Sequence, residues 1–165
     1  MATTADVLRR AADLIEKYEL DQFDVVHVIR QAAAEHTPFG LVAYKLADAA
    51  ARALAQHLRY GVDSNPAREL KRWSQIRTTS EIVAELRSAA DAAVVAADIR
   101  ARQVVLAPEW NDGQPVRITQ VHRVHGDRVA VRYQDARCRK PARAEVVAVG
   151  MELTLISGGC IGGAR

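Results

Sequence analysis

Aromatic side chains are scarce in this sequence, with two Phe, two Trp and four Tyr among 165 residues. Aromatic residues bury the largest area per side chain, so their scarcity predicts a core built mainly from aliphatic residues and alanine. Hydrophobic residues still reach 49% and charged residues 26%, which is typical of a folded domain rather than of a disordered chain. The scarcity also argues against binding of single-stranded nucleic acid, because such binders stack bases on exposed aromatic rings.

Cysteine and long apolar runs are scarce as well. The two cysteines, Cys138 and Cys160, are too few for a disulfide framework, so we expect a protein of the reducing cytoplasm. No apolar run approaches the roughly eighteen residues that a membrane-spanning helix needs, and we expect no membrane association. The N-terminal residues MATTADVLRRAADLIEKY carry charges throughout and lack the apolar region of a secretory signal.

Motifs for catalysis or cofactor binding are also absent, so we expect a non-enzymatic protein without a cofactor. His122 and His125 have the spacing of a metal-binding pair on a helix, but their surroundings predict a strand, where positions i and i+3 point to opposite sides. We therefore expect no metal site.

Cys138 lies between Arg137 and Arg139, whose charges favour a reactive thiolate. An enzymatic role for Cys138 or the histidines stays open as an alternative, although the sequence identifies no general base for it.

Residues 1–102 predict an N-terminal domain of about five helices. Signals for a helix start recur along these residues: Thr3 with Asp6, Asp21 and Asp24 as caps, Thr37 with Pro38, Ser64-Asn65 with Pro66, and Thr78-Thr79-Ser80 ahead of Glu81. Between these signals, apolar residues recur at the spacing of amphipathic helices. The last helix is expected from Glu81 to about residue 102, with an alanine-rich stripe from Ile82 to Ala97 that packs deeply against neighbours or pairs with a copy of itself.

Two segments of this half share a pattern with other proteins. Residues 5–18 read ADVLRRAADLIEKY, and residues 73–93 read WSQIRTTSEIVAELRSAADAA. The pattern resembles a small domain family of unknown function that is common in actinobacteria and their phages. The resemblance implies a fold neighbourhood and no particular activity. The chain also has 19 Arg against 4 Lys, which indicates a GC-rich coding background and a bacterial or phage source. This source agrees with the resemblance.

Residues 103–157 predict a small β-domain. Alanine becomes rarer after Gln103, and β-branched residues alternate with polar ones between turn signals such as Asp112-Gly113 and Gly126-Asp127. Roughly five short strands in this length predict a small C-terminal antiparallel β-barrel of the SH3-like kind, which places the whole chain in the α+β class. Residues 158–165 are rich in glycine and predict a flexible tail.

Residues 115–133 predict a β-hairpin that turns at Gly126-Asp127. A two-residue loop would pair Val124 with Val129, and alternation then separates an apolar face from a face with four arginines. Gln120 falls on the apolar face in this register. A bulge near residues 119–121 would move it to the other side.

Positive charge is concentrated around this hairpin. Between Arg117 and Arg143 there are eight basic residues against Asp127 and Asp135, whereas residues 1–102 hold fourteen of each sign. Arginine on a strand can bind phosphates, and we therefore predict nucleic-acid binding, with duplex or structured RNA favoured over single strands. The residues predicted to contact phosphate are Arg117, Arg123, Arg128, Arg132, Arg139 and Lys140.

Two other interpretations of the same residues remain. The arginines could form an ordinary solvated surface of an arginine-rich protein. The alanine-rich stripe from Ile82 to Ala97 could instead hold a protein partner or a second copy, as in a phage structural or host-inhibiting factor. The sequence thus predicts an accessory or regulatory protein whose partner is nucleic acid or, as the alternative, protein.

Overall fold

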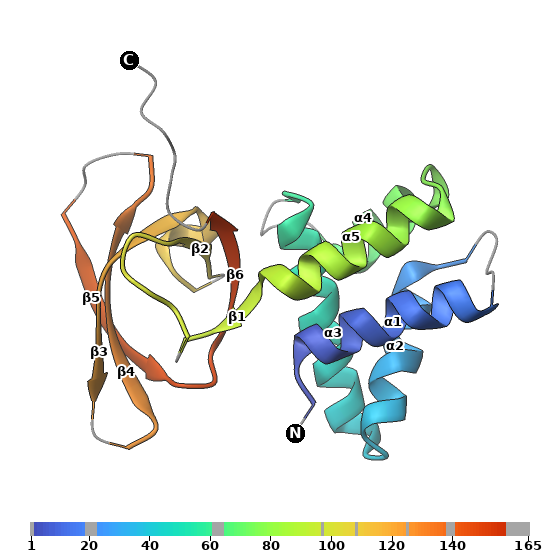
Figure 1. Ribbon diagram of the computed structural model, residues 1–165, viewed down its shortest axis with the longest axis horizontal. Coiled ribbons are helices and arrows are strands. Elements are labelled where there is room, and N and C mark those ends of the chain that lie inside the picture. Colours follow the sequence, from blue (N-terminus) through green and yellow to red (C-terminus); the bar gives the residue numbers. More distant parts are fainter. Residues whose placement is uncertain are drawn as a thin grey trace. The chain divides into compact units, whose positions relative to one another are not determined.

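The computed structural model describes residues 2–18, 23–60, 65–96, 98–107, 109–124, 126–137 and 141–157. The chain divides into two compact units, residues 1–92 and 93–165, which we describe separately (Figure 1). The first unit is helical and the second is built on one β-sheet. The predicted α+β class is therefore confirmed.

The first unit contains five helices in its described residues: α1 (Thr4–Tyr18), α2 (Val25–His36), α3 (Gly40–His57), α4 (Pro66–Gln75) and α5 (Thr79–Ala92). Most of the predicted start signals lie where the helices begin. At α1, the backbone N–H of Thr3 donates to Asp6 Oδ2 over 2.9 Å, and the Thr3 hydroxyl oxygen accepts from the Asp6 N–H over 3.2 Å. The same reciprocal pair of bonds joins Thr78 and Glu81 ahead of α5. Asn65 caps α4, whose first residue is Pro66.

The predicted start of α3 at Thr37 is wrong by about two residues. Thr37 instead ends α2, where its N–H donates to the carbonyl oxygen of Ala33. Helix α3 begins at Gly40, after Phe39, which caps the helix without a side-chain hydrogen bond. Pro38 restricts Thr37 to extended backbone, so these residues form the connection between the two helices.

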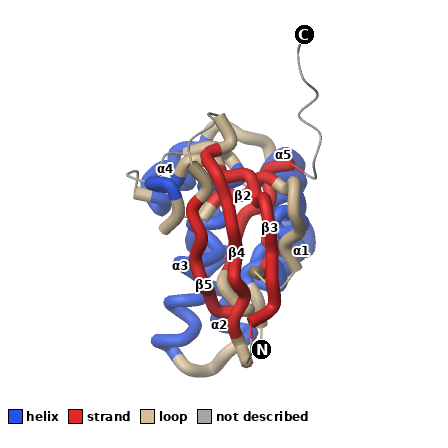
Figure 2. Tube along the Cα trace, turned by 90° about the vertical axis from the view of Figure 1, so that its left-hand side faces the viewer, coloured by secondary structure: helices blue, strands red, loops and turns tan. Residues whose placement is uncertain are grey.

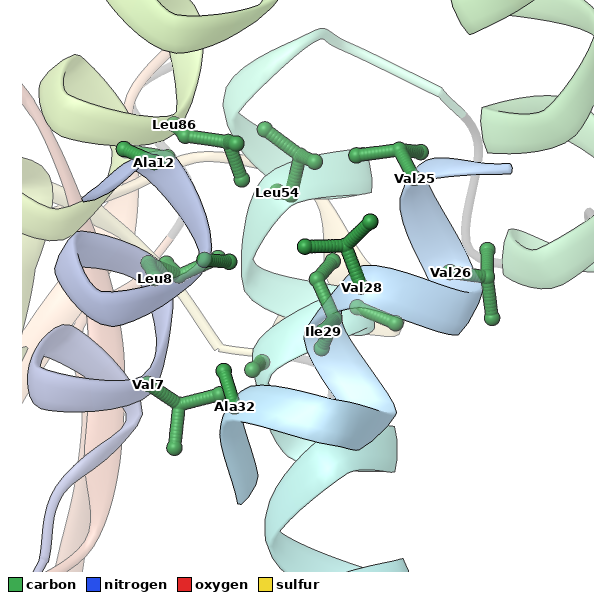
Figure 3. Packing of buried hydrophobic residues seen from close by; sticks show 14 of the residues in the cluster. Val7, Leu8, Ala12, Val25, Val26, Val28, Ile29, Ala32, Leu54 and Leu86 are labelled. Carbon is green, nitrogen blue, oxygen red and sulfur yellow. The ribbon is translucent and has the colours of Figure 1, made fainter. Parts of the chain in front are cut away.

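Aliphatic residues and alanine fill the core of the helical unit, as the scarcity of aromatics predicts. Leu8 of α1, Ile29 of α2, Leu54 of α3 and Leu86 of α5 are fully buried in one cluster (Figure 3). Helix α1 packs against α5, and the alanine-rich stripe of α5 is buried in this cluster. The stripe residues of α5 are therefore buried within the chain and are not exposed to a second copy.

Helix α5 ends at Ala92, about ten residues earlier than the periodicity predicts. Residues 93–95 form a strand, β1, which pairs with β6 and places Val94 opposite Leu153. Two adjacent β-branched residues, Val94 and Val95, favour extended backbone, and the available sheet edge satisfies their backbone groups. The division between the two units falls at this point.

One antiparallel sheet forms the second unit. Its six strands in the described residues are β1 (Ala93–Val95), β2 (Val104–Leu106), β3 (Val116–Val124), β4 (Arg128–Asp135), β5 (Arg143–Ala148) and β6 (Glu152–Ser157). Their order is β1-β6-β2-β3-β4-β5, with β1 and β5 at the two edges. Because these edges do not pair within the described part of the chain, the sheet is open and the predicted barrel is not confirmed.

A stacked aromatic pair lies in the core of the sheet unit. The rings of Trp110 and Tyr133 are almost parallel, at 12°, with centroids 4.7 Å apart, and both side chains are buried. Val116 and Ile118 of β3 and Val131 of β4 belong to the same cluster. The two aromatic residues of this unit are therefore used in its interior.

The capping bonds at α1 predict how stability depends on pH. The hydrogen bonds from Thr3 lower the pKa of Asp6, so their stabilising effect is present above the usual aspartate pKa and is lost as the pH falls through the lowered value. We expect Thr3→Ala to reduce the free energy of unfolding by about 1 kcal/mol at neutral pH, and the difference from wild type to shrink in acid.

Denaturant unfolding at several pH values measures this difference. Ser80→Ala, at an exposed position in the first turn of α5, is the matched control and should leave stability nearly unchanged. A Thr3→Ala effect that stays constant into strong acid would contradict the assignment of Asp6 as the partner.

Candidate nucleic-acid interface

The hairpin of β3 and β4 has a three-residue loop rather than the predicted two-residue loop. Val124 pairs with Arg128, which shifts the register by one residue. Gly126 has a φ of 82°, a left-handed conformation that glycine adopts without a steric penalty. His125 lies outside the described residues. The extra loop residue changes which side chains share a face.

The predicted bulge in β3 is confirmed. The register shifts between Ile118 and Gln120, and Val121 then pairs with Val131 of the core. Gln120 pairs with Arg132 and is exposed, as the bulge requires. Ahead of the bulge Ile118 is buried, and after it Val121 takes the core-facing side, so β3 keeps apolar residues toward the core on both sides of the irregularity.

The structure brings three of the six predicted arginine and lysine residues to one face. Arg128 and Arg132 are exposed on β4, and Arg117 is half-buried on β3, beside Gln134 of β4. Arg123 was predicted on this face, but it pairs with Val129, whose side chain is in the core. Arg123 is therefore exposed on the opposite side of the sheet, at the hairpin end. Arg139 and Lys140 lie outside the described residues.

We call the surface around these three arginines the cationic face. Alternation along β3, β4 and β5 assigns to it the residues that point away from the core: Arg117, Gln120, His122, Val124, Arg128, Ala130, Arg132, Gln134, Ala144, Val146 and Ala148. Figure 2 shows β4 between β3 and β5. None of these residues is acidic. Arg117 lies beside Gln134, six residue steps along β4 from Arg128, so the arginines extend over roughly 20 Å.

The arginines of the two units differ in their partners. Six arginines of the helical unit form ion pairs, for example Arg87 with Glu16 at 2.7 Å and Arg10 with Glu35 at 2.6 Å. The others are Arg9, Arg52, Arg68 and Arg77. In the described part of the sheet unit, no arginine forms an ion pair within 4.0 Å. The positive charge of the cationic face is therefore not neutralised by neighbouring carboxylates.

Two carboxylates of β4 and β5 lie on the core-facing side of the sheet, whereas Asp127 is exposed in the hairpin loop beside Arg128. Glu145 of β5 accepts a 2.5 Å hydrogen bond from the Tyr133 hydroxyl. Asp135 accepts from Asn111 Nδ2 over 3.1 Å and from the Arg137 N–H over 2.8 Å. Burial, and then the bond to Glu145, raises the pKa of Tyr133 to about 12. These bonds keep both carboxylates away from Arg128 and Arg132.

The cationic face has no aromatic residue, since Trp110 and Tyr133 stack in the core. Stacking of bases on Phe, Tyr or Trp is therefore not available there, and the main chemistry of the face is that of guanidinium groups meeting phosphate oxygens. The scarcity of aromatic residues in the sequence predicted little stacking of bases on aromatic rings. The structure shows that the two aromatic rings of this unit, Trp110 and Tyr133, lie in its core.

A ligand cavity in the sheet unit is a second kind of candidate site, and it is small. A cavity of about 210 Å³ is lined by Asn111, Tyr133 and Arg143, among others, on the core-facing side of the sheet. It is smaller than the roughly 300 Å³ typical of small-molecule sites. Across the described ranges, no three His, Cys, Asp or Glu side chains gather as metal ligands. In those ranges, too, no helix is long and apolar enough to cross a membrane.

The fold and the face together define a class: an α+β protein with a helical unit followed by an open antiparallel sheet, whose outward-facing side carries arginines that form no ion pair with a described residue. Residues 1–92 match the family of unknown function DUF6197. The chain belongs to this family, and the sequence resemblance noted above is confirmed. The match ends where the helical unit ends, so the sheet unit lies beyond it. No curated protein and no solved structure matches the chain.

The raised pKa of Tyr133 predicts a late ionisation. In the unfolded chain Tyr133 should ionise near 10.0, so its contribution to stability is full below that pH and is lost as the pH rises toward 12. We expect a difference titration of tyrosinate absorbance, wild type against Tyr133→Phe, to show one step near pH 12.

Glu145→Gln serves as the comparison, because it removes the neighbouring charge and leaves the ring buried. In Glu145→Gln, the pKa of Tyr133 should be lower than in wild type and still above the usual tyrosine pKa, since burial is the larger cause of the rise. A wild-type step at the ordinary tyrosine pKa would show that the Tyr133 hydroxyl is solvated.

Proposed function

We propose that this protein is a non-enzymatic accessory or regulatory factor of a bacterium or phage that binds nucleic acid through the cationic face. The observation that carries the proposal is a set of three arginines, Arg117, Arg128 and Arg132, that form no ion pair with a described residue and lie on strands whose outward positions hold no carboxylate. A partner with regularly spaced negative charges can neutralise such a row. Nucleic-acid phosphates provide this pattern.

The absence of aromatic residues on the face favours a duplex or structured RNA over single strands. Single-strand binders gain about 1–3 kcal/mol for each base stacked on an aromatic ring, and this face offers none. Guanidinium groups on a sheet can bind backbone phosphates without reading bases. We therefore expect weak sequence preference and strong salt dependence.

A salt series tests the proposal. Three phosphate contacts predict a slope of about −3 for the logarithm of the binding constant against the logarithm of salt concentration on duplex DNA. Arg128→Gln combined with Arg132→Gln should weaken binding and make the slope about 2 units less negative, because about 0.9 is lost for each contact. Fluorescence anisotropy with labelled DNA and RNA duplexes measures both quantities.

The matched control removes the same charge from the helical unit. Arg30 and Arg72 are exposed there and form no ion pair with a described residue, so Arg30→Gln combined with Arg72→Gln changes the net charge equally. This control should bind as wild type does. An equal loss in both double variants would mean that net charge alone acts, and binding that ignores salt would refute the proposal.

A protein partner is the second candidate, and one observation favours it. Phe39, Leu41, Val42 and Tyr44, around the first turn of α3, are each more than half exposed. Tyr44 also borders a groove of about 530 Å³ that Arg30 lines. Exposed apolar side chains gathered in this way mark protein-binding surfaces, and Arg30 would suit a partner segment with apolar residues and a carboxylate.

Substitution separates this candidate from nucleic-acid binding. We expect Leu41→Lys to abolish retention of a specific protein from host extract, while duplex binding is unchanged. Ile76→Lys, at an exposed residue at the end of α4, is the control and should retain that protein. Retention that survives Leu41→Lys would exclude this surface.

A further inference from the structure

We propose that the sheet unit forms a symmetric dimer in which β5 pairs antiparallel with β5 of a second copy, around a two-fold axis at Val146. This inference does not depend on nucleic-acid binding. It rests on the unpaired edge of the sheet, on the positions of the backbone groups along that edge, and on the side chains that each register would bring together.

The first argument is the open edge at β5. Strand β5 has six residues and pairs only with β4 in the described part of the chain (Figure 1). The opposite edge strand, β1, has three residues. A free strand edge presents unpaired N–H and C=O groups that template pairing with another chain, and β5 is the longer template.

The second argument identifies which backbone groups are free. The N–H of Val149 donates to the carbonyl oxygen of Asp127 over 2.9 Å, which continues the ladder between β4 and β5. Backbone groups alternate in direction along an antiparallel strand, so Ala144, Val146 and Ala148 direct their N–H and C=O groups away from β4. The Ala148 carbonyl accepts from the Met151 N–H and keeps a second lone pair.

The third argument is the register. With the two-fold axis at Val146, Val146 exchanges two hydrogen bonds with its copy, and Ala144 lies opposite Ala148 of the second chain. All three free positions are then paired, and the side chains on that face are small and apolar. With the axis at Glu145, two glutamates would lie directly opposite each other, which is unfavourable, and Ala148 would be unpaired. The edge is therefore self-complementary in the register centred on Val146.

Three of the devices that prevent such pairing are missing from this edge. Within residues 143–148 there is no proline, no lysine and no bulge. Val146 is 51% exposed at the middle of the strand. The charged side chains of Arg143 and Glu145 point to the core-facing side, where Glu145 is bonded to Tyr133. A second copy would cover Val146 without burying a charge.

The two-fold axis would be perpendicular to the sheet, so both copies present the same face on the same side. Arg128 and Arg132 of each copy would then belong to one continuous cationic surface of twice the width. This geometry would lengthen the phosphate-binding row if the proposed function is correct. Dimerisation itself is measured without nucleic acid, so the failure of one proposal leaves the other standing.

Sedimentation equilibrium of the full chain over a wide concentration range is the experiment. We expect a mass of about twice 18.1 kDa for wild type and a dimer weakened on the order of tenfold or more by Val146→Lys, which sets two ammonium groups at the axis. Val124→Lys is the matched control, because Val124 is 40% exposed on the same face but lies on β3. It should remain dimeric.

Cross-linking tests the register. In a Cys138→Ser, Cys160→Ser background, Val146→Cys should form an intermolecular disulfide, because paired residues of this kind have Cα atoms about 5.5 Å apart. Glu145→Cys should not. A wild-type monomer at every concentration, a dimer unaffected by Val146→Lys, or a dimer dissociated by Leu41→Lys instead would each overturn the proposal.

Discussion

The β-bulge in β3 is the constraint on which the cationic face depends. One extra residue between Ile118 and Gln120 lets the strand keep Val116 and Ile118 on the core before it and Val121 after it. Without the bulge, regular alternation through Thr119 would turn Gln120 into the core and Val121 outward. The bulge and the three-residue loop together decide which arginines are neighbours. They place Arg128 and Arg132 with Arg117 and separate Arg123 from them.

The two units use charge in different ways. In the helical unit, arginines pair with carboxylates of other helices, as Arg87 of α5 does with Asp13 and Glu16 of α1. Such exposed pairs contribute little stability each, but they leave the surface almost neutral. In the sheet unit, Glu145 of β5 is bonded to Tyr133 on the core-facing side. The surface left to Arg128 and Arg132 is therefore suited to a negatively charged partner.

The same strands offer two surfaces for association. The side chains of β3, β4 and β5 form the cationic face, and the backbone of β5 forms an open edge next to it. Val146 belongs to both, because its side chain is on the face and its N–H and C=O groups are at the edge. Pairing at the edge and phosphate binding on the face use different groups, so a dimer would leave the arginines accessible.

Local signals were sufficient to predict much of the helical unit. Thr3 with Asp6, Asn65 with Pro66 and Thr78 with Glu81 are short-range arrangements, and each forms the expected cap. The bulge was also predictable, because Gln120 interrupts an alternating strand. The end of α5 was not, since Val94 and Val95 fit a helical stripe until the edge of β6, about sixty residues further on, is available to pair with them.

The sequence alone determined the α+β class, the family of the helical unit and the concentration of positive charge between Arg117 and Arg143. Composition, periodicity and motif are properties of neighbouring residues and are readable without a fold. The tertiary structure alone decided that the sheet is open and that Arg123 leaves the cationic face. Strand order and register depend on pairing between distant segments, and one residue of register moves a side chain from one face to the other.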